Sequence, residues 1–247
     1  LLVKNLGHET LSMMIMEELN MEMQGKLQTA IDIFKNSYPK KFLHQLISGQ
    51  LDVDRMDYLT RDSFFSGVIE GMIGCDRILK MLVVVDGQLM IEEKGIYSVE
   101  KFLVARRQMY WQVYLHKTVV AAEFMLIHAL RRAKFLAKRG DDVFASPALS
   151  FFMTQDITES DFHQRKEVLG NFAQLDDYDI WSAIKVWQTH SDPILAQLAQ
   201  SLVNRKLFKI VISKEPFSEE RIAAERQRVQ DAYQLTEEEV DYFVYSD

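Results

Sequence analysis

Cysteine is almost absent from this 247-residue sequence, in which Cys75 is the single example. One cysteine excludes an intrachain disulfide and a metal site built from several thiolates, and it fits a reducing compartment such as the cytoplasm. Long apolar runs are missing too, since LVVV at 82–85 is far too short to cross a bilayer and no signal-peptide pattern opens the chain. We therefore expect a cytoplasmic protein that does not enter a membrane.

Positive charge is in the minority. The 29 Lys and Arg residues are outnumbered by 36 Asp and Glu residues, which gives a formal net charge of -7. This balance argues against the broad basic field that nonspecific nucleic-acid binding requires, so nucleic acid is not an expected partner. The 48% of hydrophobic residues is enough for a packed core in one large domain or two smaller ones.

Glycine and proline are also scarce, with 10 and 4 residues, so helical segments continue with few interruptions. The apolar spacing predicts helices at 9–20, 24–36, 40–48, 53–67, 76–82, 158–173, 177–189, 193–206 and 218–233. The segment 97–138 is predicted to be one long helix, or two helices joined by a kink. Another helix is predicted to begin at Pro147. Strands are predicted at 82–85 and 88–92 around Asp86-Gly87, a pair that suits a tight hairpin turn. Two more strands are predicted, at 207–213 and in the C-terminal VDYFVYSD.

The stretch LDVDRMDYLTRD at 51–62 combines four aspartates, two arginines and a tyrosine with few apolar residues. On a helix, residues four apart share a face, so Asp54, Tyr58 and Asp62 line up, with Arg55 beside the first of them. One face therefore offers two carboxylates, a phenol and a guanidinium.

The long helical segment has a second such face. Arg106, Tyr110 and Tyr114 are again four residues apart, and Lys117 continues the same side. Arginine can grip a phosphate with two hydrogen bonds, and tyrosine can stack on a sugar or base and bond a hydroxyl. Together the two faces could bind a nucleotide.

Both faces also have a structural interpretation. Asp57 and Arg61 are four apart in the favourable acid-first order, and we expect them to form an ion pair that supports the helix. A buried polar network between two helices would account for the remaining polar groups. Tyr110 and Tyr114 in particular are of a type found more often in cores than against ligands.

The segments SGQLDVDRMDYLTRDSFFSGV and FLVARRQMYWQVYLHKTVVAAE, in this order, closely resemble the HD-domain deoxynucleoside triphosphate triphosphohydrolases. This family includes the bacterial dGTPase-like members and the vertebrate enzyme with a SAM and an HD domain. The resemblance runs from LGHETLSMMIMEEL to about SLVNRKLFKI. It implies a mainly α fold, an HD-domain helical bundle with a small β-hairpin and a C-terminal α+β extension. Residues 1–140 would be the C-terminal part of the catalytic core, and residues 141–247 a helical extension leading into a partial α+β region.

The resemblance also implies roles for the first face. Asp54 stands where the family has the last protein ligand of a catalytic divalent metal, which could be Mn, Fe, Mg, Ni, Co or Zn. Arg55 would contact a phosphate. Tyr58 and Asp62 would hold the deoxyribose near its 3′-hydroxyl.

For the second face, the resemblance implies that Arg106 meets the phosphates and that Tyr114 packs against the sugar, which leaves no space for a 2′-hydroxyl. Tyr110 stands where the vertebrate enzyme has histidine, so its role stays open within the substrate site. His8, in GHETLS, matches a histidine that donates a proton to the leaving group. A helix cap or a core position is the structural alternative for His8.

The family also binds nucleotide effectors at an oligomer interface. Its effector site has counterparts here in His116, Lys117, Arg205 and Lys209, and the resemblance implies a homodimer or homotetramer. The cluster NRKLFK would suit a triphosphate electrostatically. A basic C-terminal turn that complements the helix dipole explains the same residues.

One family feature is missing. None of the six histidines is followed by aspartate, so the His-Asp doublet that supplies metal ligands is not in this sequence. A catalytic metal needs about three protein ligands. We expect the missing ligands to lie upstream of Leu1, and the alternative is a chain that has lost its metal.

The resemblance thus implies a metal-dependent HD-domain phosphohydrolase that converts dNTPs to deoxynucleoside and inorganic triphosphate. Another nucleotide phosphohydrolase or phosphodiesterase of the same superfamily is the nearest alternative. A noncatalytic nucleotide-sensing and oligomerisation module is a second, and a helical interaction scaffold without a nucleotide site is a third.

Overall fold

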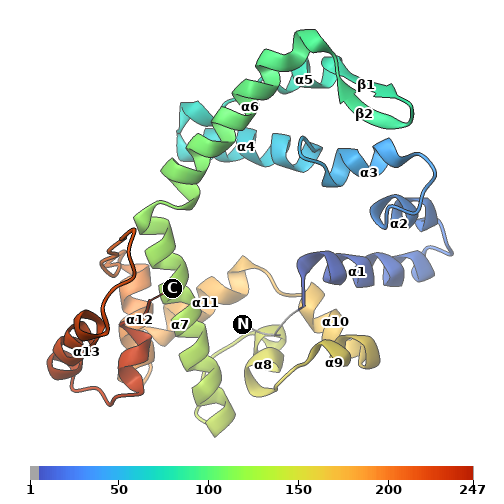
Figure 1. Ribbon diagram of the computed structural model, residues 1–247. Helices are drawn as coiled ribbons and strands as arrows, with labels where there is room; N and C mark the ends of the chain where they lie inside the picture. The colour runs from blue at the N-terminus through green and yellow to red at the C-terminus, as the bar shows by residue number, and fades with distance from the viewer. Residues whose placement is uncertain (1–5, 247) are drawn as a thin grey trace. The chain divides into compact units, whose positions relative to one another are not determined.

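The computed structural model describes residues 6–246 and is mainly helical, with one two-stranded sheet among these residues (Figure 1). The prediction of a mainly α fold is confirmed. The chain divides into two compact units, Gly7–His116 and the residues from Lys117 on. This division lies earlier than the predicted boundary at 140, because the helix that begins at Lys117 packs against later helices of the chain.

The first unit follows the predicted order of elements. It comprises α1 (His8–Glu22), α2 (Gln28–Phe34), α3 (Lys41–Ser48), α4 (Val53–Ser66), η1 (Ile69–Gly71), α5 (Cys75–Met81), β1 (Leu82–Val85), β2 (Gln88–Ile91), η2 (Glu93–Gly95), α6 (Ile96–Met109) and the π-helix η3 (Tyr110–Tyr114). The helix predicted at 24–36 is shorter than expected. Gln24 and Gly25 have φ angles of 57° and 86°, a left-handed conformation that an α-helix cannot contain.

The hairpin is confirmed. β1 and β2 pair antiparallel from Leu82↔Ile91 to Val85↔Gln88. Asp86 and Gly87 between them have φ angles of 48° and 76°, which are the positive values that a two-residue primed turn requires.

A small apolar core joins α4 to α6. Met56 and Leu59 of α4 pack with Phe102 and Met109 of α6, and Ile78 of α5 completes the buried set. The spacing of three in α4 and seven in α6 puts these side chains on one face of each helix. The polar faces that the sequence predicted are therefore brought side by side.

Gly71 lets η1 approach both helices closely. A Cβ atom at this position would lie 2.4 Å from the Sδ of Met109 and 2.9 Å from the Cβ of Ser63. Only glycine fits without movement of these side chains. The separation of α4 and α6 thus depends on this residue.

The long helical segment predicted at 97–138 is two helices, the second of the predicted alternatives. α6 ends at Met109, the π-helix follows, and α7 (Lys117–Arg139) begins after His116. The N–H of Leu115 donates to the carbonyl of Tyr110 at 2.8 Å, the i→i+5 bond of a π-turn. Among residues 6–246, no single helix has the length and apolarity for a membrane span, and only the bent pair Glu93–Tyr114 and Lys117–Arg139 passes by length and composition.

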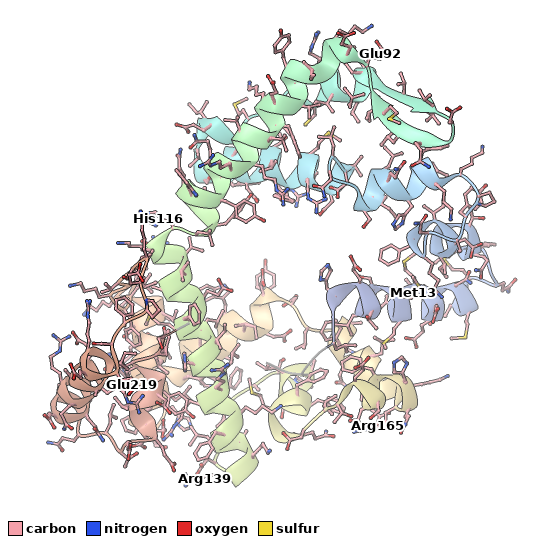
Figure 2. All side chains as sticks on the ribbon, viewed as in Figure 1. Met13, Glu92, His116, Arg139, Arg165 and Glu219 are labelled. Atoms are coloured by element: carbon pink, nitrogen blue, oxygen red, sulfur yellow. The ribbon has the colours of Figure 1, made fainter. Side chains whose placement is uncertain are left out.

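The second unit comprises α7, α8 (Pro147–Thr154), α9 (Glu159–Gln164), α10 (Lys166–Ala173), α11 (Asp177–Trp187), α12 (Pro193–Val203), α13 (Glu219–Tyr233) and η4 (Glu239–Tyr242). The helix predicted at 158–173 is divided at Arg165, whose φ of -123° and ψ of 102° are extended (Figure 2). α7, α11 and α12 surround a core that includes Met125, Trp187 and Leu198.

The strands predicted at 207–213 and near the C-terminus are wrong for the residues that the structure describes. Residues 207–213 are irregular, and Glu239–Tyr242 form a 3-10 helix. A strand needs a neighbour to satisfy its backbone groups, and none of residues 6–246 provides one here. Leu207 and Phe208 pack on the core of α7 instead, and the Phe208 N–H donates to the Sδ of Met125 at 3.3 Å. The predicted C-terminal α+β extension is therefore helical and irregular here.

Candidate functional site

Five of the predicted substrate-binding residues meet between α4 and the α6–η3 segment. The hydroxyl of Tyr114 donates to Oδ2 of Asp62 at 2.6 Å. The ring of Tyr114 meets Tyr58 edge-on at 6.1 Å between centroids and Tyr110 at 5.2 Å. The Arg106 guanidinium lies 5.7 Å from the centre of the Tyr110 ring. We call these five residues the tyrosine cluster.

The π-helix decides where Tyr114 lies. Along an α-helix, residues four apart drift steadily round the axis, because a turn has 3.6 residues. A π-turn rotates less per residue, so Tyr114 is returned toward the face of Arg106 and Tyr110. The spacing in the sequence predicted a shared face, and the π-turn keeps that face directed at α4.

Burial controls the protonation of the cluster. It raises the pKa of Tyr114, with a further increase from the hydrogen bond to Asp62. Burial and the neighbouring Tyr110 raise the pKa of Tyr58, against a lowering effect of Arg106. Hydrogen bonding to Tyr110 raises the pKa of Arg106. At neutral pH Tyr58 and Tyr114 are therefore neutral phenols beside the Arg106 cation, groups that can donate to phosphate and hydroxyl oxygens.

Arg55 is half-buried at the start of α4 and has partners of its own. Its Nη1 donates to the carbonyl of Gly49 and to Oδ2 of Asp52, and its backbone N–H donates to Oδ1 of Asp52 at 2.8 Å. Asp52 is the N-cap of α4 and is 3% exposed. Asp52 was not predicted as a functional residue, although an aspartate directly before a helical pattern is a known N-cap signal.

Asp54 lies exposed in the first turn of α4. No group of three His, Cys, Asp or Glu residues within residues 6–246 could hold a metal ion. The residues present therefore do not fit a complete metal centre, and Asp54 could supply only one ligand to such a site.

His8 is the first residue of α1 and is exposed, so it is not a core residue. Gly7, not His8, occupies the N-cap position. His8 forms no hydrogen bond, ion pair or ring contact with the described part of the chain, and the structure does not join it to the tyrosine cluster.

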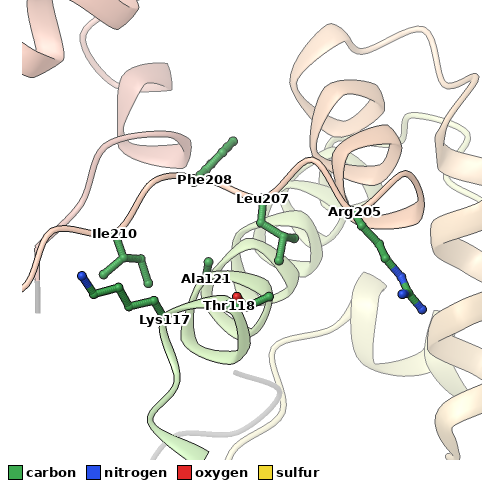
Figure 3. A pocket seen from close by; sticks show the side chains of 7 residues that line it. All are labelled: Lys117, Thr118, Ala121, Arg205, Leu207, Phe208 and Ile210. Atoms are coloured by element: carbon green, nitrogen blue, oxygen red, sulfur yellow. The ribbon is translucent and has the colours of Figure 1, made fainter. Parts of the chain in front are cut away.

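Two of the predicted effector residues line a pocket in the second unit (Figure 3). Lys117, Thr118 and Ala121 come from the start of α7, and the other lining residues follow α12: Arg205, Leu207, Phe208 and Ile210. The pocket has a volume of about 280 Å³. Figure 3 shows Lys117 and Arg205 at opposite ends of it.

The other two effector residues are placed differently. Lys209 is exposed in the segment after α12 but is not part of the lining. His116 is exposed at the end of the first unit, two residues after the π-helix (Figure 2). The structure thus places Lys117 and Arg205 at one pocket and leaves Lys209 beside it.

Residues 73–141 match the family described as the HD associated region, a span that includes Arg106, Tyr110 and Tyr114. A phosphohydrolase from Bacteroides thetaiotaomicron, known from its crystal structure, is 55% identical with a TM-score of 0.95, over 98% of this chain and 60% of that one. An uncharacterized Bacillus subtilis protein, YwfO, is 35% identical over 187 residues, or 76% of this chain and 41% of that protein.

A more distant match is the deoxynucleoside triphosphate triphosphohydrolase SAMHD1 homolog of Dictyostelium discoideum. It is 29% identical over 109 residues, which are 42% of this chain and 21% of that protein. The chain spans 41% of the Bacillus relative and 60% of the Bacteroides phosphohydrolase, so it corresponds to part of each.

Proposed function

We propose, on the premise that these matches support a relationship to the HD-domain phosphohydrolases, that this chain carries part of the substrate site of a dNTP triphosphohydrolase. The HD associated region and the Bacteroides phosphohydrolase support the hydrolase class. The name of the Dictyostelium relative supports the substrate class. The observation that carries the proposal is the Tyr114–Asp62 hydrogen bond, because it joins the two predicted faces of the substrate site.

Each side chain has a proposed part in holding the substrate. Arg55 and Arg106 would bind the phosphates, since guanidinium groups suit phosphate oxygens. Asp62 and Tyr58 would hold the 3′-hydroxyl. Tyr114, fixed by Asp62, would fill the space that a 2′-hydroxyl needs.

The reaction would be hydrolysis at the α-phosphorus. Water would add to that phosphorus, the bond to the 5′-oxygen would break, and the 5′-oxygen would take a proton. Deoxynucleoside and inorganic triphosphate would be released. His8 is the proposed proton donor, as a histidine can serve near neutral pH.

Asp54 is proposed to supply one ligand of a divalent metal in the longer protein. A bound metal of this kind lowers the pKa of water and neutralises phosphoryl charge. Because the described residues do not complete the site, we assign no step of the reaction to the metal.

The test is chromatographic product analysis of the longest natural form of the protein, incubated with mixed dNTPs and Mn²⁺. We expect deoxynucleoside and intact triphosphate from the wild type, loss of both with EDTA, and loss of both in Asp54→Ala. Asp57→Ala is the matched control, since Asp57 is an exposed aspartate of the same helix that pairs with Arg61. Product from Asp54→Ala at the control rate would refute the role of Asp54.

Ribonucleotides separate the proposal from the nearest alternative. If Tyr114 excludes the 2′-hydroxyl, dATP should be hydrolysed and ATP should not. Equal rates for the two would favour a broader nucleotide phosphohydrolase.

The pocket at Lys117 and Arg205 favours a second proposal, the binding of a nucleotide effector. The two cations form no ion pair with a described carboxylate, so both could meet phosphates at the ends of an extended polyanion. Lys209 beside the pocket would add to the attraction. The volume is near the lower limit of small-molecule sites, so part of a nucleotide would extend outside it.

Effector binding is tested by calorimetry with inorganic triphosphate on wild type and Arg205→Ala. We expect weaker binding in the variant, with Arg221→Ala, an exposed arginine of α13, as the control. Identical binding by both variants would exclude the pocket. A homodimer or homotetramer stays part of the proposal, and sedimentation with and without the effector tests it.

A further inference from the structure

We infer that Asp52 is a positioning residue that presents Arg55 to a phosphate. The inference rests on the proposed function, because it assigns the partner of a substrate-binding arginine. Asp52 is one of five buried polar or charged side chains in the described part of the chain, and it is 3% exposed. Burial of a carboxylate is costly unless the carboxylate is paired. The groups that pair with Asp52 therefore indicate its role.

Both carboxylate oxygens of Asp52 bind the same residue. Oδ1 accepts the backbone N–H of Arg55 at 2.8 Å, and Oδ2 accepts Nη1 of the Arg55 side chain. The carbonyl of Gly49 accepts from the same Nη1. The arginine is thus fixed at its main chain and at one end of its guanidinium.

The remaining donors of Arg55 are open. Its Nη2 and Nε atoms bond to no residue that the structure describes, and 31% of its side chain is exposed. A guanidinium has five N–H donors in a planar fork, so these atoms can still bind a phosphate. An arginine that is already ordered loses less entropy on binding, which favours affinity.

A second aspartate–arginine pair at a helix N-terminus, Asp192 with Arg132, provides a structural comparison for Asp52 and Arg55. Asp192 caps α12 at Leu195 and binds Arg132, as Asp52 caps α4 and binds Arg55. The side chain of Arg132 is 9% exposed and also pairs with Glu239. Arg55 is the more exposed arginine, and among residues 6–246 it pairs with no second carboxylate, which leaves its charge available to a ligand.

The test is Asp52→Asn in the longest natural form. Asparagine caps a helix as well as aspartate does and keeps one acceptor, but it removes the charge that holds Nη1. We expect KM for a dNTP to rise about tenfold with a smaller change in kcat, as for lost phosphate binding. Asp57→Asn, which removes the exposed partner of Arg61 on the same helix, should change both by less than about twofold.

A cycle with Arg55→Ala separates positioning from a merely structural role. Once Arg55 is absent, Asp52→Asn should have no further effect on KM. The inference would be overturned if Asp52→Asn raised KM equally in the wild type and in Arg55→Ala. It would also be overturned if the KM of Asp52→Asn did not differ from that of Asp57→Asn. Thermal unfolding of each variant shows whether the fold is kept.

Failure of the proposed function has a different result. If the wild type releases no product from any dNTP, that function is refuted. The affinity for inorganic triphosphate, measured in an Arg205→Ala background so that the effector pocket contributes little, then decides the inference alone, with weaker binding expected on adding Asp52→Asn or Arg55→Ala but not Asp57→Asn. Unchanged binding in Asp52→Asn would overturn the inference.

Discussion

The hydroxyl of Tyr114 donates a 2.6 Å hydrogen bond to Asp62, a residue 52 positions earlier in the chain. It ties the π-helix to α4 at the centre of the tyrosine cluster. Because burial and this bond raise the pKa of Tyr114, the phenol stays a donor throughout the physiological range. The bond therefore holds the Asp62 carboxylate in one orientation.

Tyr114→Phe should remove this bond and keep the ring. We expect the free energy of unfolding to fall by about 1.5–3 kcal/mol, as for a hydrogen bond to a charged group. Urea unfolding measures the change, and Tyr97→Phe is the control because that tyrosine of α6 is 78% exposed. Equal losses in the two variants would show that the bond adds nothing.

Arg132 and Asp192 join α7 to α12 through two hydrogen bonds, of 3.1 and 2.6 Å. Arg132→Met should lower the free energy of unfolding by about 3–5 kcal/mol, because it leaves a poorly solvated carboxylate without its cation. Lys138→Met, which removes the partner of the exposed Asp156, should have a much smaller effect, because solvent screens exposed ion pairs. Similar costs for both variants in urea unfolding would contradict this explanation.

Local patterns predicted the helices and the hairpin well. The pair Asp86-Gly87 adopts the positive φ angles of its turn, and the scarcity of Gly and Pro agrees with the predominance of helix. The strand at 207–213 could not be judged in this way, since the apolar run fits both a strand and a segment packed on α7. Strand pairing is a nonlocal property, and the sequence does not contain the register of a partner.

The site was predicted in part. Helical spacing placed Tyr58 with Asp62 on one face and Arg106 with Tyr114 on another, but that the two faces meet depends on the core of Met56 and its neighbours. The π-turn was predicted only as a kink. The Asp52–Arg55 pair was missed because a capping residue was not considered as a partner for a side chain.

Gly71→Ala should disturb the packing of α4 on α6. The added Cβ would come within 2.4 Å of Met109 and 2.9 Å of Ser63, so both must move. Overpacking of this kind costs about 1–3 kcal/mol. Gly170→Ala in α10 has open space around the Cβ, and it should instead stabilise the protein by as much as about 1 kcal/mol. Thermal unfolding of both variants checks the opposite signs.

His128 should make the protein less stable in mild acid. Its ring is buried in α7 and stacks on Tyr245 at 4.3 Å between centroids. Burial, and then the charge of Arg131, lower the pKa of His128 to about 4, against a raising effect of Asp241. Between about pH 6.5, where an unfolded histidine titrates, and about pH 4, the unfolded chain therefore binds more protons than the folded one.

The sign of the effect follows from that difference. The contribution of the neutral His128 ring to stability is fully present above about pH 6.5. It is lost as the pH decreases toward about 4, which lowers the free energy of unfolding by as much as roughly 3 kcal/mol. Urea unfolding at pH 7 and pH 5 should show a larger decrease for the wild type than for His128→Gln, in which the group that titrates is absent. Carboxylates titrate in both proteins, so the difference between the two decreases isolates His128. His163→Gln controls for the loss of an exposed imidazole, and equal decreases in wild type and His128→Gln would refute the prediction.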